Sequence, residues 1–215
     1  MKNLFRRASR CTYEAALNSA LDDLKVENET AYLNFLERDP SKFCKSYFSE
    51  LPKCDMVDNN VCETFNGYII KERGRPIIDL LDDIMQALME RMHTKLSKMS
   101  RVTDIICPRI RLKLEEIKYN SRLYSIKPAV GDKFQVSIGE DRFVVDITKW
   151  TCACREWQIT RIPCIHAVAS INWLNKDPVN FVDPYYSVEN YIQTYKHALE
   201  PINGEKCGHK LMDYP

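Results

Sequence analysis

Four side chains that can bind a soft metal ion lie between Trp150 and Ile171, and they constrain the fold more than any other feature. They are Cys152, Cys154, Cys164 and His166, spaced as C-x-C, nine residues, then C-x-H. Three thiolates and one imidazole form a complete tetrahedral ligand set for zinc. Catalytic zinc sites keep one position open for water, so this closed set predicts one structural Zn²⁺ whose binding is coupled to folding. The alternative is that these residues meet by chance in a core.

The residues before the first cysteine alternate between apolar and polar side chains, which indicates a β-hairpin. The apolar positions are Phe134, Val136, Ile138, Phe143, Val145 and Ile147, with a turn at 139–141. Side chains two apart in a strand point to the same face. If the second strand continues to Cys154, it presents both sulfur atoms of the C-x-C pair to one ion.

The second ligand pair requires a different backbone. Residues two apart in a helix lie about 200° apart around its axis, so Cys164 and His166 cannot both reach one ion from within a regular helix. Pro163 interrupts any regular helix at this point. We predict a turn over 162–165 and then a helix that begins near His166 and runs toward Asn175.

This ligand pattern after a hairpin, with Trp150 before the first cysteine and a helix after the histidine, resembles the SWIM zinc finger. The run CIHAVASI resembles the form of the finger in plant Mutator-like transposases and in the far-red-impaired-response proteins derived from them. The resemblance extends over residues 4–200 or so. It implies a nuclear protein that binds DNA.

A second informative stretch spans residues 54–76. Its spacing predicts a helix from about Asn60 to Lys71, with Asn60 as N-cap and Glu63 completing a capping box. The pattern NN-x-x-E-x-F-N, followed by I-x-x-x-R-x-x-P-I, also resembles the end of the Mutator-like transposase catalytic domain. That resemblance implies an RNase H-like core with a D-D-E triad, in which Glu63 would be the third carboxylate.

The triad of that family is incomplete in this sequence. Its two aspartates lie far upstream of the motif, before the first residue here. Two-metal phosphoryl transfer needs several carboxylates, and Asp55 and Asp58 do not match the missing positions. We therefore expect no catalytic residue and no enzyme activity, with Glu63 a relic that caps a helix. The rival is a fragment of an active transposase.

Helical patterns fill most of the remaining chain. They predict helices within residues 4–38, with Thr12 as an N-cap and a break near Asn28, and further helices that begin at Pro76 and Pro108. Aromatic residues over 185–195 indicate a short helix that packs back on the zinc module.

The expected class is therefore α+β, a mainly helical N-terminal remnant of an RNase H-like domain followed by a small hairpin-plus-helix zinc finger. The predicted domains are 1–128 for the helical remnant, 129–176 for the zinc finger, and 177–215 for a C-terminal helix and tail.

The overall charge does not indicate a nucleic-acid partner, because 31 Lys and Arg residues balance 30 Asp and Glu residues. Local charge differs: basic side chains outnumber acidic ones over residues 91–127. That run is either a solvated helical face or a phosphate-binding surface. The sequence holds no signal-peptide core and no run of about 18 apolar residues, so we expect no membrane contact.

We expect DNA or a protein partner, including a second copy of the chain, and no small-molecule substrate. A pure protein-interaction module and a decayed coding relic remain as alternatives.

Overall fold

The computed structural model describes residues 2–53, 60–70, 74–197 and 199–202. The chain forms two compact units, Met1–Asn60 with Pro108–Pro184, and Val61–Cys107 with Tyr185–Pro215. This grouping cuts across the ranges 1–128, 129–176 and 177–215 drawn from the sequence. The free thiols are those of Cys11, Cys44, Cys107, Cys152, Cys154 and Cys164. No helix in the described part of the chain has the length and apolar character needed to cross a membrane.

The first unit begins with three helices, α1 (Lys2–Arg10), α2 (Glu14–Glu27) and α3 (Glu29–Glu37), followed by the 3-10 turns η1 (Pro40–Lys42) and η2 (Lys45–Tyr47). Their apolar sides meet in a small core. It contains Ala8, Leu17, Ala20, Leu24, Phe35 and Cys44. The Phe35 ring lies edge-on to those of Phe5 and Phe43, with centroids 4.8 and 5.0 Å away.

The helix break predicted near Asn28 is confirmed. The Asn28 side chain accepts a hydrogen bond from the backbone N–H of Ala31 at 2.8 Å and so caps α3. The prediction of Thr12 as an N-cap is wrong. Tyr13 occupies the N-cap of α2 without a side-chain hydrogen bond, and the Thr12 hydroxyl donates to the backbone carbonyl of Cys154.

The same unit contains a four-stranded antiparallel sheet in the order β1-β2-β3-β4. The strands are β1 (Ser125–Ala129), β2 (Lys133–Ile138), β3 (Asp141–Asp146) and β4 (Thr151–Cys152). The predicted hairpin is β2 and β3, joined at Gly139, whose φ of +57° suits glycine. Val136 pairs with Phe143 in this register, and Val145 pairs with Cys152 in the next.

Two parts of the sheet correct the sequence-based expectation. Strand β1 lies where the chain was expected to be helical; Pro128 is tolerated because β1 is an edge strand. In addition, the second hairpin strand does not continue to Cys154. The chain turns after β3, with Trp150 at a φ of +56°, and returns as β4.

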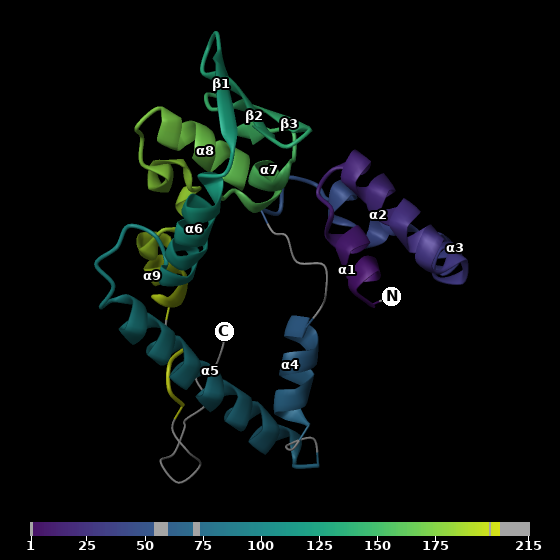
Figure 1. Cartoon of the computed structure of the whole chain (residues 1–215). Coiled ribbons are helices and arrows are strands. Elements are labelled where there is room, and N and C mark those ends of the chain that lie inside the picture. Colours follow the sequence, from purple (N-terminus) through teal and green to yellow (C-terminus); the bar gives the residue numbers. More distant parts are fainter. Residues whose placement is uncertain (1, 54–59, 71–73, 198, 203–215) are drawn as a thin grey trace, which may run out of the picture. The chain divides into compact units, whose positions relative to one another are not determined.

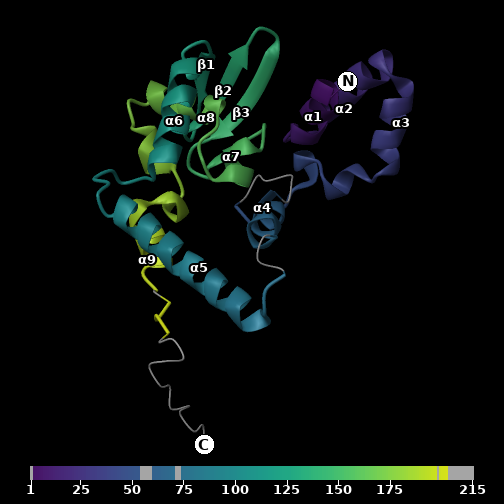
Figure 2. The ribbon, with the colours of Figure 1, turned by 90° about the horizontal axis from the view of Figure 1, so that it is seen from below.

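The helix α8 (Ile165–Trp173) lies against this sheet, and α6 (Pro108–Ser121) packs on α8 (Figures 1 and 2). The core beneath α8 includes Phe134, Val136, Val145 and Trp157. The short helix α7 (Glu156–Thr160), which the sequence patterns did not predict, follows β4. The turn η3 (Pro178–Phe181) comes after α8, and η4 (Pro184–Tyr186) begins where the unit ends.

The second unit contains α4 (Asn60–Ile69), α5 (Ile77–Met99) and α9 (Val188–Tyr195). The predicted helix after Pro76 is confirmed as α5. The predicted aromatic helix is α9, but it packs on α5 in its own unit, where the sequence had indicated the zinc module. A bridge between Ile106 and Ser187 fixes its start.

The predicted capping box of α4 falls partly outside the described residues. Glu63 itself lies exposed on α4. Asp55 and Asp58 lie outside the described residues.

Candidate metal centre

The first two ligands come from the end of β4 and the tight turn that follows it. Pairing with Val145 positions Cys152. The backbone N–H of Arg155 then donates to the carbonyl of Cys152 at 2.8 Å, while Arg155 adopts a φ of +60°. The C-x-C pair is therefore presented by a turn, whereas the sequence had indicated a continuous strand.

The second pair comes from the start of α8, as predicted. Cys164 is the N-cap residue of the helix with an extended backbone, and His166 lies in its first turn. Because Cys164 is outside the helical backbone, the two side chains can converge although they are two residues apart. The predicted break after Pro163 is confirmed, and the helix begins at Ile165.

The four ligand atoms all lie within 4.8 Å of one another. The Sγ atoms of Cys152 and Cys164 lie 3.6 and 3.9 Å from His166 Nδ1. A tetrahedral zinc ion with bonds of about 2.3 Å to sulfur and 2.0–2.1 Å to nitrogen has S···N edges of about 3.6 Å. The residues present therefore fit a zinc ion, with Nδ1 as the histidine donor atom.

All four ligand residues are buried, with exposed fractions between 1% for Cys164 and 7% for His166. The His166 ring stacks on Phe143 with centroids 3.9 Å apart and planes inclined by 24°. Tyr124 meets the same ring edge-on at 5.2 Å. These two aromatic side chains fix the plane of the imidazole and shield it from water.

Gln158 holds Cys152 from both sides. Its side-chain carbonyl accepts from the N–H of Cys152 at 3.1 Å, and its amide donates to the Cys152 carbonyl at 2.9 Å. The sequence analysis missed this residue. The available signal was a polar side chain between Trp157 and Ile159, both of which are buried.

The three buried thiols of the cluster shift one another's pKa values. A hydrogen bond from Cys152 lowers the pKa of Cys154 far below its usual range. The same bond raises the pKa of Cys152, and burial raises the pKa of Cys164. Zinc binding requires the thiolates, so loading the site releases protons. A closed set with three sulfur ligands and one nitrogen ligand leaves no position for a reacting water, which is the arrangement of a structural ion.

Outside the cluster, the basic run over 91–127 is divided between the two units. On the first unit, a surface hollow of about 510 Å³ lies between the C-terminal ends of α6 and α8. Its lining includes Lys118, Arg122, Lys176, Asn172 and Asn175.

Part of the charge beside this hollow is neutralised within the protein. Lys118 Nζ lies 3.0 Å from a carboxylate oxygen of Glu115 and 3.6 Å from one of Asp177. Arg122 lies over the ring of Tyr119, with its guanidinium carbon 5.8 Å from the centroid. Arg122 and Lys176 therefore carry the charge available to an external anion.

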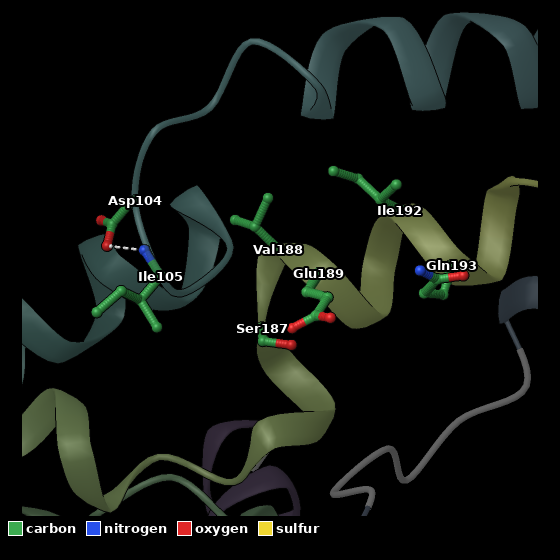
Figure 3. Close-up of a pocket in the computed structure, with 7 residues that line it drawn as sticks. All are labelled: Asp104, Ile105, Ser187, Val188, Glu189, Ile192 and Gln193. Carbon is green, nitrogen blue, oxygen red and sulfur yellow. Dashed lines mark hydrogen bonds between the residues drawn. The ribbon is translucent and has the colours of Figure 1, made fainter.

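A second hollow, of about 380 Å³, lies in the other unit between the 104–105 segment and α9 (Figure 3). Ile105, Val188 and Ile192 line it together with the carboxylates of Asp104 and Glu189. The Asp104 carboxylate already accepts from the backbone N–H of Ile105 at 2.7 Å. Within the lining, these side chains form neither a nucleophile–base pair nor a metal-ligand set.

Residues 134–172 match the family model of the SWIM zinc finger. Comparisons with curated proteins and with solved structures gave no match. The matched range contains β3, β4 and α7 and nearly all of β2 and α8, together with the four ligands. The chain therefore contains a SWIM zinc finger whose buried Cys152, Cys154, Cys164 and His166 are suited to one zinc ion. SWIM zinc fingers are generally nucleic-acid or protein-interaction modules.

Proposed function

We propose that this protein uses its zinc-stabilised SWIM finger to bind DNA in the nucleus, and that it derives from a Mutator-like transposase without keeping catalytic activity. The observation that carries DNA binding is the hollow beside the finger, where Arg122 and Lys176 offer charge and Asn172 and Asn175 offer amide groups. Arg and Lys with amide side chains are the usual donors to phosphate oxygens.

The origin and location rest on sequence motifs. CIHAVASI within the finger and the NN-x-x-E-x-F-N pattern around Glu63 support the Mutator-like relation. The closed zinc set supports a binding role over catalysis, since the ion would organise the fold and hold no substrate.

The direct test is DNA affinity measured as a function of salt concentration. Each phosphate contact contributes about −0.9 to the slope of log K against log salt. The double variant Arg122→Ala, Lys176→Ala should weaken binding and reduce the magnitude of the slope by about two. Arg10→Ala on α1, also an exposed cation, is the matched control. An unchanged slope in the double variant would remove this surface from the proposal.

A second candidate is a protein-interaction module, and α5 favours it. This helix has no buried residue, and Ile77, Ile78 and Leu81 are 65%, 72% and 58% exposed. Exposed apolar surface of this kind indicates a partner or a second copy of the chain. Concentration-dependent sedimentation, together with DNA binding that is absent at low salt, would favour this candidate.

A further inference from the structure

The first three helices reach the zinc centre at one point, the loop between α1 and α2. The Thr12 hydroxyl donates to the backbone carbonyl of the ligand Cys154 at 2.6 Å. The next residue, Tyr13, lies edge-on to Phe143 with centroids 5.8 Å apart. Phe143 is the ring that stacks on His166. One loop thus supports a cysteine ligand directly and the histidine ligand through a single intervening ring.

Arg155, the residue after Cys154, makes the reciprocal contact. Its guanidinium donates to the backbone carbonyls of Thr12, Ser46 and Phe48, the last at 3.0 Å. These carbonyls lie on the two segments that flank the helical core, before α2 and around η2. A guanidinium presents several donors in a rigid fork, whereas the ammonium group of lysine is a single point charge.

The contacts are concentrated on the metal-binding turn. The left-handed backbone of Arg155 points its side chain away from the turn that carries Cys152 and Cys154, toward the helices. In metal sites, losing a group that holds a ligand in place typically lowers metal affinity by about 10–100-fold. Thr12 and Tyr13 occupy this supporting position although the SWIM match begins only at residue 134. Arg155 lies within the match and donates to the Thr12 carbonyl.

We propose that α1–α3 form a cap on the zinc centre, that Arg155 and Thr12 hold the cap closed, and that the closed cap slows the release of zinc. The cap belongs to the zinc centre and does not depend on DNA binding. It makes the N-terminal helices part of the metal site, a role that neither the ligand spacing nor the family match assigns to them.

The experiment uses the full chain loaded with zinc. It is mixed with excess chelator, and the release of zinc is followed with a colorimetric indicator. Arg155→Met removes the donors but keeps a long side chain, and Thr12→Val removes the hydroxyl at similar volume. Each should release zinc about tenfold faster than the unaltered protein, the lower end of the effect of losing a supporting group. Arg142→Met, an exposed arginine on β3, should release it at the original rate.

Hydrogen exchange of α2 and α3, measured with zinc bound, reports the cap separately. The proposal expects faster exchange in these helices together with faster zinc release. Faster exchange with an unchanged release rate would overturn it, because the cap would then open without affecting the metal. If Arg155→Met fails to retain zinc at all, the test rests on Thr12→Val. A zinc release rate of Thr12→Val within about twofold of that of the unaltered protein also overturns the proposal.

Discussion

At the scale of single residues, the metal centre depends on side chains that are not metal ligands. Gln158 satisfies both backbone hydrogen-bonding groups of Cys152 from inside the protein, and Phe143 orients His166. A buried amide that pairs with two backbone groups is costly to remove: the N–H of Cys152 then loses its Gln158 acceptor, and the Cys152 carbonyl keeps only the Arg155 N–H as a donor.

Gln158→Leu should therefore lower the free energy of unfolding of the zinc-loaded protein by about 2 kcal/mol. Urea denaturation measures the change. Gln86→Leu is the control, because Gln86 lies exposed on α5 and its amide donates to the nearby Asp82 carboxylate. A loss equal to that of the control would mean that the Gln158 bonds contribute little.

At the scale of elements, the N-terminal helices combine a capping residue with a buried thiol. Asn28 separates α2 from α3, while Cys44 sits within their shared core with no exposed surface. Burial, together with a smaller contribution from the nearby Cys11, raises the pKa of the Cys44 thiol to about 11. The folded helices therefore favour the neutral thiol.

This shift predicts a loss of stability in alkali. Because the pKa of Cys44 is higher in the folded state than the ordinary 9.0, its contribution is complete below pH 9 and is lost as the pH rises toward about 11. The urea midpoint should fall across this range, and Cys44→Ala should reduce the fall. Other thiols and tyrosines titrate in both proteins, so the difference between them isolates Cys44. Equal pH dependence would contradict the assignment.

At the scale of the whole molecule, all four zinc ligands lie in one of the two compact units. Zinc binding should therefore stabilise one set of elements selectively. The Cys₃His set ties β4, a strand of two residues, to the start of α8.

Chelation should speed hydrogen exchange in β2, β3 and α8 by at least tenfold and leave α5 unchanged, since ligand binding energy is folding energy only where the ligands are. Metal analysis gives the companion result. Cys164→Ala should lose its zinc, and Cys44→Ala, an equally buried thiol outside the cluster, should keep it. An equal rise of exchange in α5 would show that the two units fold as one.

The ligand set, the hairpin of β2 and β3, the start of α8 and the long helix α5 follow from the sequence alone. Each rests on local physics: donor chemistry at fixed spacing, alternation of apolar residues, a proline break, and helical periodicity. These signals are readable because every contributing residue is close to the others in the chain.

The remaining features were decided by the tertiary structure. The alternation within β3 could not show that the chain turns at Trp150 and returns as β4, because both paths place Cys152 near the hairpin. Thr12 matched an N-cap by local pattern, yet a carbonyl far along the chain is its acceptor. The Arg155 guanidinium likewise bonds to the carbonyls of Thr12 and Phe48, which are distant in sequence, and only folding brings such partners together.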